Sequence, residues 1–416
     1  MSFLEKKFVH IKPSSTLAIN ELSKKIETGG EKVFKFGLGQ SPFPVPKLLV
    51  NELQKYAHSK DYLDVSGLYK LRKFIAKYHS KKNKFEYDSD DVLVGPGSKE
   101  LLFQSQMVLD GITLLPAPSW VSYAPQSNFL GKKILWIETN ADENWHISAN
   151  LLEDTCKKNK ENKLLILNSP NNPSGTSNLQ LKEIAFIAKK YNLIMISDEI
   201  YAELDFKGNY QSITHFYPEG TIISSGLSKW CGAGGWRLGT MIFPKNLSFI
   251  RKAMRSIASE TFTSVSAPIQ HAAVKAYEVD HNDFLKKSRF ILHFVSSCLH
   301  KELISVGVKA LKPTGGFYIL CDFSKVLRKS DNITSDQELS NYLLEKLGVA
   351  SLPGSDFGLA KEKMILRLAF VDFDGERALN FLKNKNKLEI NDYKKLFPMV
   401  YEGISRIKNW VLNKSI

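Results

Sequence analysis

The chain has 416 residues, of which 43% are hydrophobic and 24% are charged, and its formal net charge is +14. This length predicts two or three domains, with a core large enough to need neither disulfides nor metals for stability. The four cysteines form no C-x-x-C pair, which argues against a zinc ribbon and favours a reducing compartment, and the basic residues are too dispersed to predict nucleic-acid binding.

The N-terminal part of the chain shows neither a leader nor a regular element. Residues 1–10 lack the apolar run of a signal peptide, and no stretch of the sequence reaches the roughly 18 apolar residues of a membrane span. A cytoplasmic protein without membrane contact is therefore expected. Three prolines within residues 37–46 predict a loop there. We assign residues 1–45 to an N-terminal segment that packs on a smaller C-terminal domain.

Short apolar runs bounded by turn formers predict six buried strands in the middle of the chain. Helical patterns lie between the strands, as in Lys99–Val108 and Leu179–Tyr191. This alternation predicts an α/β fold, with a mostly parallel sheet between helices, for a large domain over residues 46–285. The six runs are Ile112–Leu115, Ile134–Ile137, Leu164–Leu167, Leu193–Ile196, Thr221–Ile223 and Met241–Phe243.

The pattern changes after about residue 285. A long helical stretch is followed by shorter runs with strand and helix periods, which predict a smaller α+β domain over residues 286–416. The expected helices are Phe284–Val306, Ser335–Leu347 and Asp372–Lys383, and the expected strands are Lys309–Leu311, Gly315–Leu320 and Ile365–Ala369.

Two polar segments follow neighbouring predicted strands. Asn172 lies in a turn rich in proline and asparagine, where its amide could bind a ligand oxygen. Asp198 leaves the end of an apolar run, and Tyr201 follows it; a carboxylate placed there could pair with a cationic ring nitrogen. Taken singly, the Asn172 segment is also compatible with an ordinary strand-to-helix turn, and Asp198 could cap the next turn.

A third segment, Ser224–Gly239, surrounds one lysine with small residues. Lys229 is a candidate for covalent attachment of a carbonyl compound if its pKa is lowered, and Arg237 could grip a phosphate through its planar fork. Taken alone, Lys229 would more often be a solvated lysine. The sequence contains no H-E-x-x-H, no histidine spacing typical of a metal site, no Walker A pattern and no complete dinucleotide fingerprint, so no metal is expected.

Together these segments resemble the class I/II aminotransferases of the aspartate aminotransferase fold, which are fold type I enzymes dependent on pyridoxal 5'-phosphate. The motifs that carry the resemblance occur in the family's order: Asn168–Gly175, Asp198–Tyr201, Ser228 with Lys229, Gly235–Gly239 and Leu366–Leu368. The resemblance implies a seven-stranded type of sheet and covers most of the chain, from about Gly37 to Arg367. One position departs from the family's pattern, because Gly226 stands where many members carry a phosphate-binding serine or threonine.

The resemblance also implies roles for individual residues. Lys229 would hold the cofactor and later act as general base, and Asp198 would pair with the pyridine nitrogen. Asn172 and Tyr201 would bind the ring's phenolic oxygen, and Arg237 would bind the phosphate.

Further implied contacts complete the site. Backbone amides at Gly97, Ser98 and Lys99 would hold the phosphate, and Trp120 would stack on the pyridine. Tyr62 would reach the phosphate of a neighbouring subunit, so a homodimer is implied. Arg367 would bind the substrate α-carboxylate, and Gly39 would lie in a loop over the substrate.

The implied reaction is a ping-pong transfer of an amino group between an L-amino acid and a 2-oxo acid. Lys99 occupies the place where one branch of the family binds a distal carboxylate, so aspartate or glutamate is the expected donor, and an aromatic amino acid stays possible. Two alternatives stay open. One is another reaction on the same cofactor, such as that of a β-lyase or an aminocyclopropane-carboxylate synthase, and the other is a non-catalytic scaffold on this fold.

Overall fold

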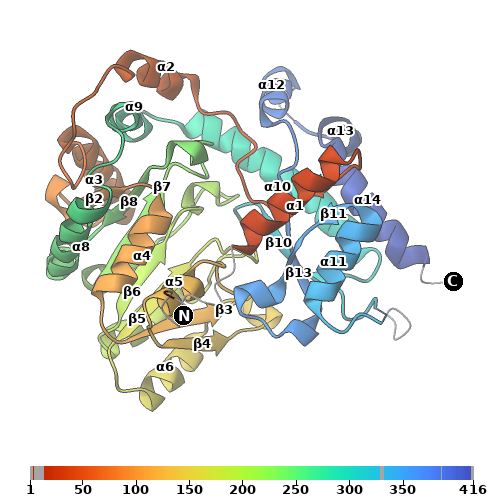
Figure 1. Ribbon diagram of the computed structural model, residues 1–416, viewed down its shortest axis with the longest axis horizontal. Coiled ribbons are helices and arrows are strands. Elements are labelled where there is room, and N and C mark those ends of the chain that lie inside the picture. The colour runs from red at the N-terminus through yellow and green to blue at the C-terminus, as the bar shows by residue number, and fades with distance from the viewer. Residues whose placement is uncertain (1–2, 4–13, 328–331, 386, 414–416) are drawn as a thin grey trace.

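A seven-stranded sheet crosses the larger part of the molecule in the order β2-β8-β7-β6-β5-β3-β4 (Figure 1). The computed structural model describes residue 3 and residues 14–327, 332–385 and 387–413. Strand β8 runs antiparallel to both of its neighbours, and the other adjacent strands are parallel, so the prediction of a mostly parallel α/β sheet is confirmed. The strands are β2 Val92–Gly95, β3 Ile112–Ala117, β4 Ile134–Glu138, β5 Lys163–Asn168, β6 Ile194–Asp198, β7 Thr221–Gly226 and β8 Gly239–Ile242.

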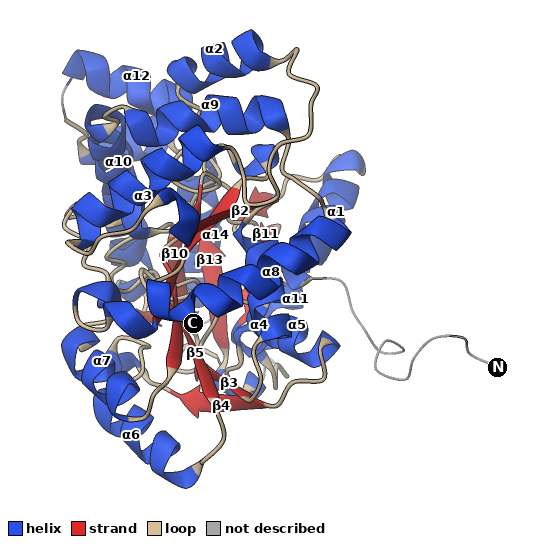
Figure 2. Cartoon of the chain, turned by 90° about the vertical axis from the view of Figure 1, so that its left-hand side faces the viewer, coloured by secondary structure: helices blue, strands red, loops and turns tan. Residues whose placement is uncertain are grey.

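The apolar strands bury side chains on both faces of this sheet. Alternate residues such as Leu165 and Ile166 belong to two separate hydrophobic clusters, because successive side chains of a strand point to opposite faces. Helices α6 (Ala149–Lys158) and α7 (Leu181–Lys190) cover one face. Helices α4 Ser98–Val108, α5 Tyr123–Phe129 and α8 Ser248–Thr261 cover the other face, as Figure 2 shows for α4 and α5.

A second, antiparallel sheet of four strands has the order β12-β13-β10-β9. Its strand β13 has the predicted bounds, but β10 begins three residues later than predicted, because Gly316 has a positive φ of 64° that breaks the extended chain. The strands are β9 Lys309–Ala310, β10 Tyr318–Asp322, β12 Leu352–Pro353 and β13 Ile365–Ala369, and the helices beside them are α10 Asn282–Ile304, α11 Asp336–Leu347, α12 Gly375–Lys385, α13 Ile390–Leu396 and α14 Pro398–Asn413.

The N-terminal residues that the structure describes join this second part of the molecule. Strand β1 (Phe34–Lys35) pairs in parallel with β11 (Val349–Ala350), and α1 (Ser15–Thr28) lies beside α11, where Ile19 and Ile26 pack near Leu344 (Figure 1). Most of residues 1–13 of the predicted segment 1–45, and residues 328–331, 386 and 414–416 of the predicted domain 286–416, lie outside the described residues. The division into these domains stays a prediction.

Helices α2 (Lys47–Tyr56), α3 (Tyr69–Asn83) and α9 (Ala267–Glu278) pack together beyond the antiparallel edge of the large sheet. Among the described residues, no helix is long and apolar enough to cross a membrane, and no three side chains of His, Cys, Asp or Glu are grouped as a metal site would require.

Candidate active site

Three neighbouring strands end at one edge of the large sheet, where ligands of open α/β sheets bind. Asn168, Asp198 and Ser224 lie side by side in the register of β5, β6 and β7. The Asn168 side chain donates to the backbone oxygen of Asp198 at 2.9 Å and accepts from the backbone N–H of Asn172 at 2.7 Å. These two hydrogen bonds hold the turn that contains Asn172 next to Asp198.

Asp198 is buried at this edge and holds two hydrogen bonds. The hydroxyl of Tyr123 donates to Asp198 Oδ2 at 2.6 Å, and the N–H of Ile200 donates to Oδ1 at 3.3 Å. Burial raises the pKa of Asp198 to about 6, although these bonds and the charge of Lys229 act in the opposite direction. The sequence analysis missed Tyr123, whose only signal was its position three residues after Trp120 in the same segment.

Lys229 follows β7 and points into the site. Its Nζ donates to the backbone oxygen of Gly39 at 2.9 Å and lies 5.8 Å and 5.7 Å from the ring centroids of Tyr201 and Phe317. Burial, followed by the positive charges of Arg367, Lys99 and Arg237, lowers the pKa of Lys229 to about 8, against the opposite effect of Asp198. An amine with such a pKa is partly neutral near pH 7 and can accept a proton.

Arg367 comes from β13 of the second sheet and is 1% exposed. Its guanidinium donates to Asn172 Oδ1 at 3.2 Å and to the backbone oxygen of Gly37, and it lies 4.6 Å from the centroid of the Tyr318 ring. Within the described part of the chain, its Nε has no hydrogen-bond partner. A buried cation whose recorded acceptors are neutral oxygens favours an anionic ligand.

Gly97 and Arg237 form a tight cradle at the start of α4. Gly97 has φ of 95°, and a Cβ there would lie 2.2 Å from Nη2 of Arg237, so only glycine fits. Arg237 donates to the backbone oxygens of Gly234 at 2.9 Å and Pro96 at 3.3 Å. A Cβ on Gly239 would lie 2.1 Å from the backbone nitrogen of Ser98, so the cradle closes on the amides of a helix N-terminus, which suits a phosphate.

Lys99 and Trp120 lie together beside this cradle, with Lys99 Nζ 5.1 Å from the centroid of a Trp120 ring. Burial, followed by the charge of Arg237, lowers the pKa of Lys99. The pair therefore adds a further cation and an aromatic face next to the phosphate cradle.

Gly226, the position that departs from the family's pattern, lies at the paired end of β7. A Cβ there would lie 2.8 Å from the backbone oxygen of Leu238 and 3.1 Å from Cα of Gly239, which is too close for a side chain. The backbone of the facing strand thus explains why glycine occupies this position in this chain.

Tyr201 is buried in the site, and its hydroxyl shares a hydrogen bond of 2.9 Å with the hydroxyl of Tyr318. The sequence analysis missed Tyr318, although it lies in the Gly-Gly-Phe-Tyr run that was assigned to a strand. A Cβ on Gly39 would lie 1.9 Å from the Tyr318 hydroxyl, so this loop glycine allows the close approach of the two segments.

Tyr62 differs from the other predicted site residues. It is 88% exposed and takes part in none of the contacts described above. The structure therefore brings together Gly39, Asn172, Asp198, Tyr201, Lys229 and Arg367, and beside them Gly97, Ser98, Lys99, Trp120 and Arg237, and it leaves Tyr62 outside this group.

A cavity of about 620 Å³ is lined in part by Glu199, Ala202, Ser225 and Trp230, which neighbour the site residues in the sequence. Its lining contains none of the predicted site residues, and neither does that of a second cavity beside α7.

The charges at this edge determine which groups could bind. The cationic side chains of Lys99, Arg237 and Arg367 act on Lys229, and the buried carboxylate of Asp198 acts on it with the opposite sign. This excess of positive charge fits a ligand that carries a phosphate at one end together with a carboxylate-bearing substrate, and the amine of Lys229 lies among these groups.

Comparison with known proteins agrees with this arrangement. The family model described as aminotransferase class I and II matches residues 31–378. The chain is 31% identical over 359 residues to an aspartate aminotransferase of Bacillus sp. (strain YM-2), a match that covers 83% of this chain and 90% of that protein. It is 32% identical over 363 residues to a probable aspartate/prephenate aminotransferase of Aquifex aeolicus, covering 84% and 90%. The solved structure of aspartate aminotransferase from Thermus thermophilus with maleate superposes with a TM-score of 0.82 at 27% identity, covering 91% of this chain and 98% of that one.

Proposed function

The chain belongs to the aminotransferase class I and II family and is an aminotransferase, and from this premise we propose that it holds pyridoxal 5'-phosphate between Lys229 and Asp198. The observation that carries the proposal is the convergence of a buried carboxylate, an amine of lowered pKa and a helix N-terminus beside an arginine. A pyridinium N–H requires an acceptor such as the carboxylate, an aldehyde requires an amine, and a phosphate requires N–H donors.

Each end of the cofactor would have its own group of residues. When bound, the cofactor supplies an aldehyde that takes up an amine and a ring that accepts electrons. Asp198, supported by Tyr123, would keep the ring nitrogen protonated, and Asn172 and Tyr201 would donate to the phenolic oxygen. Trp120 would cover one face of the ring.

The phosphate would lie at the start of α4. The backbone amides at Gly97, Ser98 and Lys99 and the guanidinium of Arg237 would bind its oxygens. We further propose a homodimer in which Tyr62 of the partner subunit completes this end of the site.

Lys229 would move the proton of the reaction. Its Nζ, with a pKa of about 8, would take the proton from the substrate α-carbon and return it, since a base works best when its pKa is close to the working pH. The Gly39 carbonyl, 2.9 Å from Nζ, would orient the amine and lies in the loop that covers the substrate.

The substrate would be bound through its carboxylates. Arg367 would take the α-carboxylate as a bidentate pair, and Lys99 would take the distal carboxylate of aspartate or glutamate. The acceptor would be a 2-oxo acid, bound through the same groups in the second half of a ping-pong cycle. The relatives' names, aspartate and aspartate/prephenate aminotransferase, support a dicarboxylic donor, and we expect action in the cytoplasm.

Transamination can be tested with a panel of amino acids as donors and with 2-oxoglutarate and oxaloacetate as acceptors. The absorbance of the bound cofactor is recorded in the same assay. We expect the new amino acid to appear in step with the lost donor, with the highest kcat/KM for aspartate or glutamate. Ammonia and pyruvate formed without an oxo-acid acceptor would indicate β-elimination instead. A spectrum without bound cofactor would indicate a non-catalytic scaffold.

Lys99→Ala tests the choice of substrate. The variant should lose kcat/KM for aspartate by about tenfold to a hundredfold, because one charge-assisted hydrogen bond is removed, and should keep its rate with alanine. Full activity on aspartate and glutamate would exclude Lys99 as the distal-carboxylate residue, and preference for an aromatic donor would favour the other expected substrate class.

A further inference from the structure

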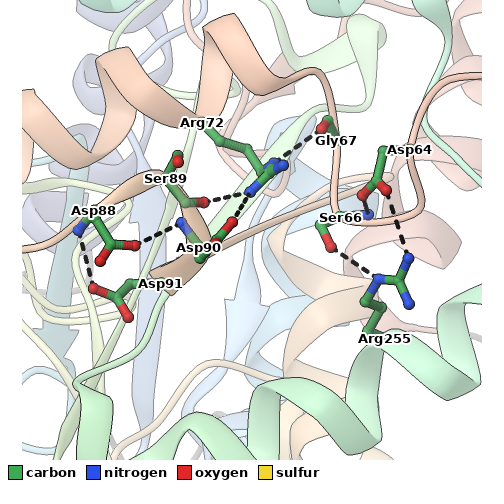
Figure 3. Close-up of polar contacts among 9 residues, drawn as sticks. All are labelled: Asp64, Ser66, Gly67, Arg72, Asp88, Ser89, Asp90, Asp91 and Arg255. Atoms are coloured by element: carbon green, nitrogen blue, oxygen red, sulfur yellow. Dashed lines mark hydrogen bonds and ion pairs between the residues drawn. The ribbon is translucent and has the colours of Figure 1, made fainter.

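The loop of residues 57–68 between α2 and α3, here named the Tyr62 loop, is fastened at its base by an arginine from a distant helix. Arg255 of α8 donates from Nε to Oγ of Ser66 at 3.2 Å and approaches Oδ2 of Asp64 with Nη2 at 3.5 Å (Figure 3). Asp64 Oδ1 also accepts from the backbone N–H of Ser66 at 2.7 Å. One guanidinium therefore holds two residues of the loop together.

A second set of contacts fastens the end of the loop to the large sheet. The backbone N–H of Val94 in β2 donates to the oxygen of Ser66 at 3.0 Å. The buried side chain of Arg72 donates to the oxygen of Gly67 at 3.0 Å and to Oδ1 of Asp90 at 3.1 Å (Figure 3). Strand β2 ends at Gly95, two residues before the phosphate cradle at Gly97, so the loop and the cradle are attached to the same strand.

The tip of this loop is exposed although its base is fixed. Tyr62 is 88% exposed, and Tyr69, the first residue of α3, is 61% exposed. Large aromatic side chains held out on a fixed support are typical anchors of protein interfaces. The phosphate end of the site is exposed too, at Lys99 and Arg237, so each chain has an uncovered cradle and an uncovered tyrosine.

We propose that Arg255 is a positioning residue that acts across the subunit boundary: it sets the Tyr62 loop of one copy so that Tyr62 completes the phosphate end of the other copy's site. This inference rests on the proposed function and on the proposed homodimer. Its occupant is a second copy of this chain, whose exposed Arg237 guanidinium would share the phosphate with the incoming tyrosine hydroxyl.

The contact made by Arg255 is suited to positioning rather than to folding. The side chains of Arg255 and Asp64 are 48% and 49% exposed, and ion pairs at that exposure contribute little to the free energy of unfolding. Variants at these positions should therefore fold, and any effect on cofactor binding can be separated from an effect on stability.

Mixed dimers of two differently tagged chains test the direction of the effect. One chain carries Lys229→Ala, so that borohydride can trap pyridoxal 5'-phosphate only on Lys229 of the other chain, and trapped mass is measured against cofactor concentration. Arg255→Ala is placed either on the Lys229→Ala chain or on the intact chain. In the first arrangement we expect the apparent dissociation constant of the trapped site to rise about threefold to tenfold, and in the second to stay within about twofold.

Each other outcome overturns the proposal. An equal or larger effect when Arg255→Ala lies on the intact chain would place the action of Arg255 within its own subunit. An unchanged dissociation constant in both arrangements would contradict the positioning role of Arg255. A monomeric mass for the cofactor-loaded wild type would contradict the proposed homodimer. Failure of the wild type to trap cofactor on Lys229 would instead count against the proposed function.

Three further variants sharpen the test. Asp64→Asn, on the other side of the contact, should reproduce the effect if Arg255→Ala proves unstable. Arg255→Lys should restore part of the affinity, because it keeps the charge and loses the fork. Lys252→Ala, an exposed residue on the same helix, should leave the dissociation constant and the melting temperature unchanged.

Discussion

The two ends of the site differ in how far a single chain encloses them. At the closed end, Asn172, Asp198 and Arg367 are between 1% and 3% exposed, and they are joined by hydrogen bonds within the chain. At the open end, Lys99 and Arg237 are exposed beside the helix N-terminus. The difference teaches that the buried groups of the closed end are held in place within one chain, whereas one chain leaves the cations of the open end uncovered.

This difference has an electrostatic consequence. A charge buried at the closed end interacts strongly with its partners, because little water screens it, and an unmatched polar group there is costly. Charges at the open end are screened by solvent and salt. Equal changes in chemistry at the two ends should therefore have unequal effects.

Removal of the amine between the two ends should have the largest effect. Lys229→Ala should lower kcat by a factor on the order of 10⁶, because it removes the amine proposed both to hold the cofactor and to take the proton. A coupled assay of amino-group transfer measures this loss. The variant should still bind pyridoxal 5'-phosphate without a covalent bond, and more than about 1% residual activity would contradict the role of Lys229.

A matched pair of arginine variants compares the ends directly. Arg367→Lys should raise KM for amino acids by about 30-fold to 1000-fold, because it leaves polar groups unpaired in a buried position. Arg237→Lys should weaken cofactor binding by no more than about tenfold, since the phosphate end is exposed. Steady-state kinetics and cofactor titration give the two numbers, and equal losses would break the comparison.

Asp198→Asn should stabilise the cofactor-free protein while it abolishes most activity. The pKa of Asp198 is raised from 3.8 to about 6, so the folded state binds this proton more tightly, and the stabilisation that the carboxyl gives below pH 4 is lost as the pH rises through 6. Asparagine has no carboxyl to ionise, so the variant does not lose this stabilisation as the pH rises. Its free energy of unfolding at pH 8 should therefore exceed that of the wild type by about 1–3 kcal/mol.

Urea unfolding at pH 8 and pH 5 measures this gain, which should shrink at the lower pH. Asp110→Asn, at an exposed carboxylate, serves as the control and should show no such dependence on pH. A loss of stability at pH 8 in Asp198→Asn would show that the buried charge does not destabilise the closed end.

Tyr123→Phe should have only a small effect on cofactor binding. It removes the 2.6 Å hydrogen bond to Asp198, which should raise the pKa of Asp198 further and weaken cofactor binding about threefold to tenfold. The loss should be larger at pH 6 than at pH 8.5, because Asp198 is then more often protonated. Tyr217→Phe, another buried tyrosine beneath β6, should leave cofactor binding unchanged.

Much of the central sheet could be predicted, and the reasons are local. Strands β3, β5, β6 and β7 are short apolar runs bounded by turns, and their burial on both faces makes that pattern clear. The edge strand β4 was predicted from its apolar run although it is only partly buried. Strand β2 and helix α1 were missed. The four residues of β2 are too short to show a period, and most of α1 is polar or half-exposed, with Ser23 as its one residue recorded as buried.

The sequence by itself determined which groups the chain carries for chemistry: a lysine among small residues, an aspartate at a strand end, and an arginine near the C-terminus. Turns at strand ends and glycine-rich segments are recognisable within a few residues, so these three groups could be predicted from local sequence. Only the tertiary structure decided which groups meet. Tyr123 of α5 reaches Asp198 across 75 positions, and Arg367 of the second sheet reaches Asn172 across 195. No local pattern encodes such contacts, because the packing of a helix on one sheet and of one sheet beside the other creates them.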